Sequence, residues 1–269
     1  MRLIASDIDG TILGHDGRIS RRTVDAFAAA AEAGVEIVFV TGRPPRWLEP
    51  IREQLGHAGT VICSNGAVSY DLGAEKVLGS HLLPWETVEK VRGIVKELDP
   101  QSYFALESLT GLHVEEGFFG SRTPASSASV VPAVLTPGIA DAGIVKMLAV
   151  RHTGNADEFL ELVYPHIGVL IGVTHSAPDL ALLEMGARGV NKAVTLAEYA
   201  AARGIDAADV VAFGDMPNDI EMLGWAGSGY ALASGHPQAL AAAALVAPRF
   251  EDDGVAQVIE SRLAALRLA

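Results

Sequence analysis

The sequence predicts an α/β fold: a parallel sheet with helices on both faces, built from the two ends of the chain, with a smaller α+β module inserted. Short apolar runs alternate with helical periodicity near the N-terminus, and the same rhythm returns near the C-terminus. The intervening part has more strand-like runs than helices. With 269 residues, 49% of them apolar and 20% charged, the chain is long enough for a second compact unit.

The N-terminal part predicts alternating strands and helices. Ser20 is a good helix N-cap, and Gly34 is well placed to end that helix. Residues 35–40 are β-branched and aromatic apart from Glu36, which is typical of a strand covered on both faces. In order, the predicted elements are strand 3–6, helix 20–33, strand 35–40, helix 44–55 and strand 60–64.

The rest of the chain predicts the inserted module and the return to the first fold. Near the C-terminus the predicted elements are helix 191–203, strand 210–213, helix 217–223 and helix 253–266. In the middle they are helices 86–98 and 155–164, strands 102–106, 112–115, 144–150, 169–174 and 180–184, and a Ser/Ala/Pro-rich loop at 121–137. We therefore predict a discontinuous core of residues 1–83 and 187–269, and an inserted domain of residues 84–186.

Composition excludes several classes of function. The formal net charge of −13 disfavours general binding to nucleic acid or to anionic membranes, because both require a basic surface. The N-terminal apolar run is too short for a signal peptide, and no apolar run reaches membrane-spanning length. Cys63 is the single cysteine, which fits a reducing compartment. We expect a cytoplasmic protein, a monomer or small homo-oligomer, without nucleic-acid or membrane partners.

Polar residues follow four of the predicted strands. In open parallel sheets, ligands bind at the carboxyl ends of the strands, so these four clusters should converge in space. The clusters are Asp7-Ile8-Asp9-Gly10-Thr11, Thr41-Gly42-Arg43, Ser64-Asn65-Gly66 and Gly214-Asp215-Met216-Pro217-Asn218-Asp219. Their convergence is the strongest functional signal in the sequence.

The acidic residues of these clusters predict a site for a cation. For Asp7 and Asp9 alone, a turn in which the carboxylates cap backbone donors explains the motif equally well. Asp215 changes this balance, because three carboxylates at one sheet edge need a hard cation, and oxygen ligands suit Mg²⁺. Asn218 and Asp219 face the same strand end and can hold the metal ligands in place.

Thr41 and Lys192 are candidates for binding phosphate. A hydroxyl and backbone N–H groups at a strand-to-helix turn form an anion cradle, although an ordinary turn explains Thr41 equally well. Asn191 resembles a helix N-cap, so Lys192 lies in the first helical turn, where the helix dipole disfavours a cation. A solvated surface lysine is the alternative. The eight histidines lack metal-ligand spacing, and neither nucleotide-binding glycine motif is present.

The order of these motifs resembles the haloacid dehalogenase superfamily of phosphohydrolases, and within it the Cof-type, sugar-phosphatase-like branch. Gly189-Val190-Asn191-Lys192 and Asp252-Asp253-Gly254-Val255 also match that branch. The resemblance extends over nearly the whole chain and implies a doubly wound, Rossmann-like core with an inserted α/β cap. One departure is Leu232-Ala233-Ser234-Gly235-His236, where the branch usually carries a run similar to Met-Gly-Asn-Ala.

The resemblance implies a role for each matched residue. Asp7 would attack phosphorus and form an aspartyl-phosphate, and Asp9 would act as general acid and then general base. Mg²⁺ would be bound by Asp7, Asp215 and the Asp9 carbonyl, with Asp219 in support. Phosphoryl oxygens would be held by Thr41, Lys192, Asn218 and the amides of Ile8 and Gly42. Arg43 and Asn65 would be supporting residues.

The predicted function is therefore a Mg²⁺-dependent phosphatase that acts on a small phosphorylated metabolite, such as a sugar phosphate. The inserted module would act as a cap that excludes water and selects the substrate. A phosphomannomutase-like phosphomutase remains open, because the motifs do not separate hydrolysis from phosphoryl transfer. A non-catalytic protein that binds a phosphorylated metabolite is a further alternative. A receiver-like regulatory domain is disfavoured, because it needs no inserted domain.

Overall fold

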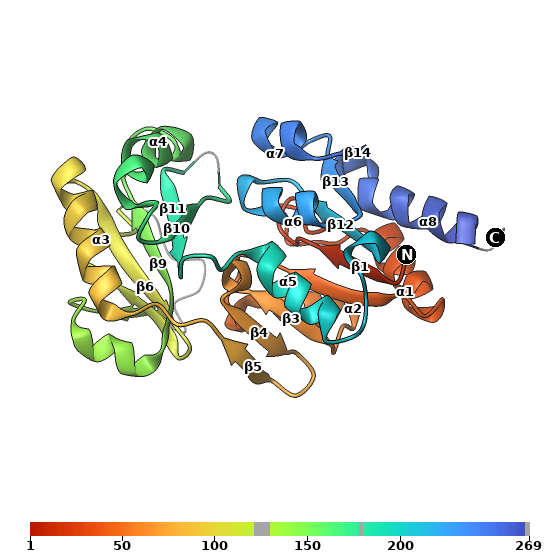
Figure 1. The fold of residues 1–269 in the computed structure, drawn as a ribbon, viewed down its shortest axis with the longest axis horizontal. Helices are drawn as coiled ribbons and strands as arrows, with labels where there is room; N and C mark the ends of the chain where they lie inside the picture. The colour runs from red at the N-terminus through yellow and green to blue at the C-terminus, as the bar shows by residue number, and fades with distance from the viewer. Residues whose placement is uncertain (121–129, 178–179, 267–269) are drawn as a thin grey trace. The chain divides into compact units, whose positions relative to one another are not determined.

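The computed structural model describes residues 1–120, 130–177 and 180–266. The chain forms two compact units, shown in Figure 1. The first unit, called the core unit here, comprises Met1–Gly79 and Asn191–Ala269. The second, called the inserted unit, comprises Ser80–Val190. The assignment of these units as catalytic core and cap remains a prediction.

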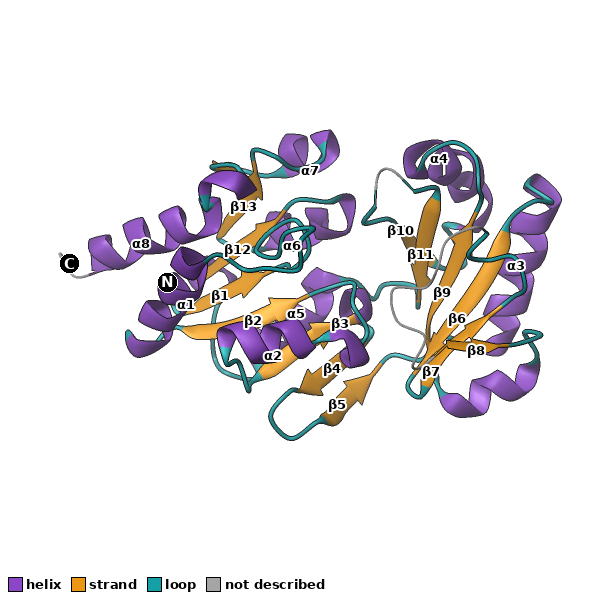
Figure 2. Ribbon diagram, turned by 180° about the vertical axis from the view of Figure 1, so that it is seen from behind, coloured by secondary structure: helices purple, strands orange, loops and turns teal. Residues whose placement is uncertain are grey.

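The core unit is built on one sheet with the strand order β14-β13-β12-β1-β2-β3-β4-β5 (Figure 2). Neighbouring strands from β14 to β3 are parallel, and β4 is antiparallel to β3. The strands are β1 (Leu3–Ser6), β2 (Glu36–Val40), β3 (Thr60–Cys63), β4 (Val68–Asp71), β5 (Lys76–Ser80), β12 (Val210–Gly214), β13 (Ser228–Leu232) and β14 (Leu245–Ala247).

Helices cover both faces of this sheet. Val38 and Val40 of β2 pack in one apolar cluster with residues of α5 and α6, whereas Phe39, which alternates to the other face, packs edge-on against Phe27 of α1. The helices of the core unit are α1 (Arg21–Glu32), α2 (Glu49–Leu55), α5 (Lys192–Ala201), α6 (Ile220–Trp225), α7 (Pro237–Ala242) and α8 (Gly254–Leu266). The predicted α/β fold with a parallel-sheet core is confirmed.

The inserted unit has its own sheet, with the order β10-β11-β9-β6-β7-β8. All neighbouring strands are antiparallel except β7 and β8. Residues of α3 and α4 share one apolar cluster with residues of this sheet. The elements are α3 (Trp85–Leu98), β6 (Tyr103–Ser108), β7 (Gly111–Val114), β8 (Val130–Pro132), β9 (Ile144–Val150), α4 (Ala156–Ile167), β10 (Gly172–Thr174) and β11 (Leu182–Gly186).

Several local predictions are confirmed by hydrogen bonds at the helix ends. Ser20 accepts the backbone N–H of Thr23 and begins α1, and Asn191 accepts the backbone N–H of Val194 and begins α5. The second of these caps matters for function, because it makes Lys192 the first residue of α5.

Other local predictions were wrong. The predicted helix 44–55 is divided into a 3₁₀ turn, Pro45–Trp47, and α2, since prolines at positions 45 and 50 cannot supply helical N–H donors. The predicted loop 121–137 lies partly outside the described residues, and Val130–Pro132 within it form β8 by pairing with β7. Strands β4, β5, β13 and β14 were not predicted, because they are short or largely exposed and depend on neighbouring strands.

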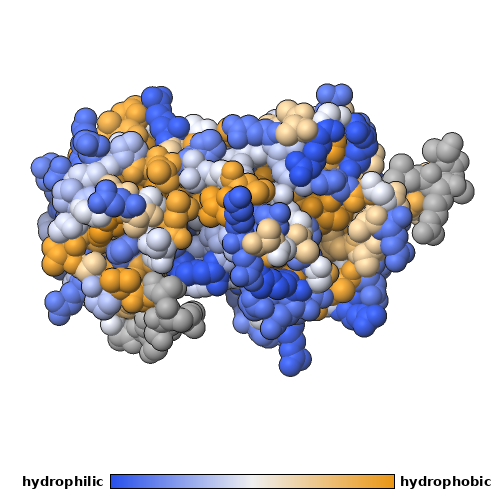
Figure 3. All heavy atoms as spheres, turned by 90° about the horizontal axis from the view of Figure 1, so that it is seen from below, coloured by the Kyte–Doolittle hydropathy of each residue, from blue (hydrophilic) through white to orange (hydrophobic). Residues whose placement is uncertain are grey.

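The surface carries both polar and apolar residues, as the composition of 49% apolar and 20% charged residues leads us to expect. Figure 3 shows hydrophilic residues interspersed with hydrophobic ones over the face that it presents. Across the described ranges, no helix is long and apolar enough to cross a membrane.

A close approach between β13 and α6 yields a test of this packing. A Cβ added at Gly229 would lie 1.9 Å from the Leu223 carbonyl oxygen, whereas one added at Gly224, within α6, would meet no atom within 4 Å. We expect Gly229→Ala to lower the free energy of unfolding by about 3 kcal/mol. Gly224→Ala should raise it by about 0.5–1 kcal/mol. Chemical denaturation measures both, and equal effects would contradict the packing.

Candidate active site

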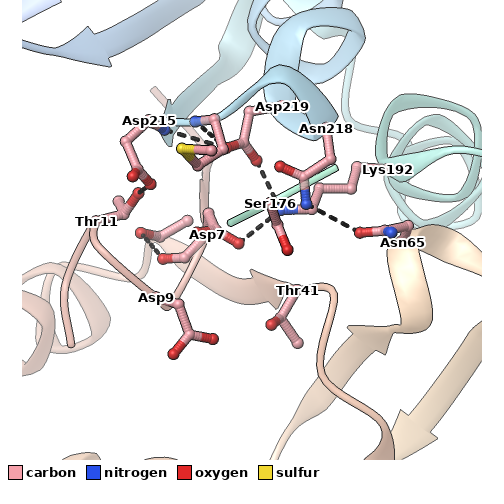
Figure 4. A network of polar contacts seen from close by, with 12 residues as sticks. Asp7, Asp9, Thr11, Thr41, Asn65, Ser176, Lys192, Asp215, Asn218 and Asp219 are labelled. Carbon is pink, nitrogen blue, oxygen red and sulfur yellow. Dashed lines mark hydrogen bonds and ion pairs between the residues drawn. The ribbon is translucent and has the colours of Figure 1, made fainter. Parts of the chain in front are cut away.

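Four loops of the core unit meet at the carboxyl edge of its sheet (Figure 4). Because β1, β2, β3 and β12 run parallel, the residues after them emerge at the same edge. The loops carry Asp7, Thr41, Asn65 and Asp215, and α5 adds Lys192 from the other half of the unit. The predicted convergence of the polar clusters is therefore present in the structure.

Lys192 lies at the centre of the site. Its side chain is fully buried, and its Nζ donates to Asp7 Oδ1 at 2.5 Å and to Asp219 Oδ1 at 2.7 Å. Burial lowers the pKa of Lys192, but the carboxylates of Asp219 and Asp7 outweigh burial and raise the pKa above its ordinary value. Lys192 is thus a permanent ammonium group, and the alternative of a solvated surface lysine is excluded.

Asp219 anchors the loop that follows β12. Its Oδ1 receives Lys192, while its Oδ2 accepts the backbone N–H groups of Asp215 and Met216, each at 3.0 Å. The side chain is fully buried, so these three charge-assisted hydrogen bonds replace its lost hydration. Asp219 therefore holds the backbone of Asp215 in place, and its role in supporting a metal ligand remains a prediction.

Thr11 also positions Asp215, and the sequence reasoning assigned it no role. The Thr11 hydroxyl donates to Asp215 Oδ1 at 2.6 Å, and both side chains are buried. The two residues lie 204 positions apart. One feature of the sequence could have indicated this role: Thr11 ends the acidic turn Asp7–Thr11, which is predicted at the same sheet edge as Asp215.

Three buried carboxylates form a group that fits a cation. Asp7, Asp215 and Asp219 each offer an oxygen within 4.8 Å of the other two. Burial raises the pKa of Asp7 well above its ordinary value; Lys192 lowers it, and the other carboxylates raise it. Burial, with Asp219 next, raises the pKa of Asp215 to about 7. A single lysine leaves this group with excess negative charge, and its oxygen donors fit a hard ion such as Mg²⁺.

Asp9 lies beside this group without joining it through its side chain. Figure 4 shows the Asp9 carboxylate pointing away from that of Asp7. Arg43 binds both of its oxygens, Nε to Oδ2 and Nη2 to Oδ1, each at 2.7 Å. Arg43 is itself held by a hydrogen bond from Nη1 to the Trp47 carbonyl at 2.9 Å. The guanidinium thus fixes both the position and the plane of the Asp9 carboxylate.

The predicted phosphate-binding residues other than Lys192 lie in the turns after β1, β2 and β12. The buried Thr41 hydroxyl oxygen accepts the Arg43 backbone N–H at 3.0 Å, which leaves its own O–H as a donor. Asn218 is buried, and its Nδ2 donates to Asn65 Oδ1 at 3.0 Å. The contacts of these residues, of Lys192 and of the Ile8 and Gly42 amides with phosphate all remain predictions.

Comparison with known proteins then decides the family. A family model described as haloacid dehalogenase-like hydrolase matches residues 4–259. The chain belongs to this family. The predicted family is confirmed, and the predicted enzyme class, a phosphoric monoester hydrolase, agrees with the names of the relatives that follow.

Two relatives and one solved structure illustrate the match of this haloacid dehalogenase-like hydrolase. It is 29% identical to the pyridoxal phosphate phosphatase YbhA of Escherichia coli K12, over 97% of this chain and 98% of the relative. It is 30% identical to an HMP-PP phosphatase of E. coli 55989, over 88% of this chain and 86% of the relative. The phosphatase BT1666 of Bacteroides thetaiotaomicron has the same fold, with a TM-score of 0.79. Its sequence identity is 22%, and the match covers 97% of this chain and 94% of BT1666.

The raised pKa of Asp215 predicts how pH affects this hydrolase. Its folded value of about 7 exceeds the ordinary 3.8, so between these values the folded state binds more protons than the unfolded state. Without metal, Asp215 should therefore lower the stability as the pH rises from about 4 to about 7. If Mg²⁺ binds Asp215 as predicted, it competes with these protons and should stabilise the protein more at pH 8 than at pH 5.

Thermal unfolding with chelator and with Mg²⁺ at pH 5 to 8 measures both effects. Asp215→Asn removes the titrating group and is the matched variant, so the difference between it and the wild type isolates the contribution of Asp215. The prediction is contradicted if, in chelator, the wild type gains stability relative to Asp215→Asn as the pH rises.

Proposed function

We propose that this protein is a Mg²⁺-dependent phosphatase that hydrolyses a small phosphorylated metabolite. The observation that carries the proposal is the bridge from Lys192 to Asp7 and Asp219, beside the carboxylate of Asp215. This arrangement puts a permanent cation against one candidate nucleophile and leaves oxygen ligands for a metal. Phosphoryl transfer needs in-line positioning and neutralisation of charge, and the Lys192 ammonium supports the second requirement.

Asp7 is the proposed nucleophile. A carboxylate oxygen of Asp7 attacks phosphorus, the bond between phosphorus and the leaving oxygen breaks, and Asp9 gives its proton to that oxygen. In the second step Asp9 takes a proton from water, whose oxygen attacks phosphorus, so that inorganic phosphate leaves and the Asp7 carboxylate is regenerated. Mg²⁺, held by Asp7, Asp215 and the Asp9 carbonyl, would supply positive charge at the phosphoryl oxygens.

Lys192 and neighbouring donors are proposed to hold the phosphoryl group. The Lys192 ammonium stays close to Asp7 through both steps and offsets the negative charge that accumulates there. The Thr41 hydroxyl, the Asn218 amide and the backbone N–H groups of Ile8 and Gly42 complete the proposed set. These neutral donors suit an anion that must be released after each turnover.

Arg43 is proposed to position Asp9. A general acid must point at the leaving oxygen, which lies on the far side of phosphorus from the nucleophile in an in-line reaction. The Asp9 carboxylate points away from Asp7, and two hydrogen bonds from Arg43 keep it there. Arg43 therefore orients Asp9 toward the leaving group, and one of its two hydrogen bonds opens when Asp9 carries the proton.

The substrate class is the finer part of the proposal. The named relatives act on pyridoxal phosphate and HMP-PP, and the branch that the sequence resembles is sugar-phosphatase-like. We propose a small organic phosphate of this kind, with selection by the cap predicted over residues 84–186. We also propose that the protein works in the cytoplasm as a monomer or small homo-oligomer.

Release of inorganic phosphate from a panel of phosphorylated metabolites tests the function. We expect release in the presence of Mg²⁺ and none after chelation. Asp7→Asn should lower kcat more than about 1,000-fold because the amide is a poor nucleophile. The variant should stay folded, since it removes charge from a crowded acidic site. Substantial residual turnover would exclude Asp7 as the nucleophile. Transfer that needs a bisphosphate activator, without release, would favour a phosphomutase.

The role of Arg43 is tested by the dependence on leaving group. Arg43→Lys keeps the charge but loses the paired hydrogen bonds to Asp9. We expect kcat/KM to fall about 100-fold for alkyl phosphates, which need a general acid, and only a few-fold for p-nitrophenyl phosphate. Arg22→Lys is the matched control, because Arg22 makes a similar paired contact with Glu260 on the surface. Equal losses for both substrates with Arg43→Lys would refute the role.

A further inference from the structure

The turn after β3 has an unusual backbone. Ser64, Asn65 and Gly66 have φ values of +52°, +57° and +99°, so three consecutive residues lie in the left-handed region. Glycine adopts this region readily and asparagine tolerates it, but side-chain-bearing residues are strained there. Such strain persists only where surrounding contacts enforce it, and it concentrates at functional sites.

The contacts that enforce the turn come from the candidate active site. The Ser64 N–H donates to the Arg43 carbonyl at 2.9 Å, and the Asn65 N–H donates to the Thr41 carbonyl at 3.0 Å. On the other side, a Cβ at Gly66 would lie 2.3 Å from the carbonyl oxygen of Asn191, the residue before Lys192. The turn is thus wedged between the Thr41 loop and the start of α5.

From this turn, the Asn65 side chain reaches Asn218. Asn65 Oδ1 accepts a hydrogen from Asn218 Nδ2 at 3.0 Å. At the other end of the same amide, Asn218 Oδ1 is buried and has no hydrogen-bond partner within the described ranges. With the Asn65 amide oriented as observed, this contact favours one of the two orientations of the Asn218 amide. In the reversed orientation, two carbonyl oxygens would face each other.

We propose that Asn65 is a positioning residue that fixes the Asn218 amide with its nitrogen at the phosphate site. Nδ2 carries two hydrogens; Asn65 takes one, and the second is held ready for a phosphoryl oxygen. A reversed amide would present an oxygen to the anion and repel it. This inference rests on the proposed function, since it assigns a donor to the phosphoryl group that the phosphatase would bind.

A glycine at position 65 can separate this positioning role from a purely structural one. A glycine would adopt φ of +57° without strain, and this gain offsets the loss of the hydrogen bond to Asn218, so Asn65→Gly should change the melting temperature little. The same variant removes the oxygen that holds Asn218. We expect stability and activity to move independently, whereas a purely structural role would lower both together.

The test compares Asn65→Gly, Asn218→Ala and the double variant. Each single variant should lower kcat/KM about 10- to 100-fold and weaken inhibition by inorganic phosphate by a similar factor. The double variant should be no worse than Asn218→Ala, because Asn65 acts through Asn218. Glu75→Gly is the matched control, since Glu75 has φ of +53° in the β4–β5 turn and should keep full activity.

The inference would be overturned if Asn65→Gly kept full activity, or if the double variant lost activity by the product of the two single losses. Neither result would contradict the proposed phosphatase activity. Asn65→Ala in the Asn218→Ala background repeats the cycle if the glycine variant does not fold. A wild type that hydrolyses no phosphate ester would overturn the proposed function instead. Calorimetric binding of inorganic phosphate with Mg²⁺ would then decide the inference, and equal affinity of wild type and Asn65→Gly, or no binding to either, would refute it.

Discussion

The fully buried ammonium of Lys192 is the constraint on which the rest of the site depends. Two carboxylates receive it, and without it Asp7 and Asp219 would face each other as unpaired buried charges. Removal of the ammonium alone would leave both carboxylates buried without a cation, which costs far more than the group contributes in net stability. Position 192 is a poor place for a cation by helix dipole alone, and the two carboxylates more than offset that penalty.

The parallel sheet makes this arrangement possible. Residues after β1, β2, β3 and β12 emerge at one edge, so short loops suffice to bring distant parts of the chain together. The supporting hydrogen bonds come from the same edge: Thr11 and Asp219 hold Asp215, and Arg43 holds Asp9. Each charged group is therefore positioned by a neighbour on another loop, and the site gains rigidity from the sheet.

Some residues of the candidate active site are held in energetically unfavourable states. Asp7 and Asp215 have raised pKa values because burial and neighbouring carboxylates disfavour their charged forms. Ser64 and Asn65 have strained backbones. Both features lower the stability of the isolated protein. Both are typical of functional sites, and they fit a site that binds a cation and a phosphoryl group.

The sequence by itself determined the α/β rhythm, the caps Ser20 and Asn191, and the sheet edge at which Asp7, Thr41 and Asp215 gather. These depend on local periodicity and on the common direction of parallel strands. Only the tertiary structure decided the partner of each polar group. Lys192 with Asp219, Asn65 with Asn218, and Thr11 with Asp215 are pairs separated by 27, 153 and 204 positions. Hydrogen bonds form or fail within a fraction of an ångström, and only the packed chain defines distances so closely.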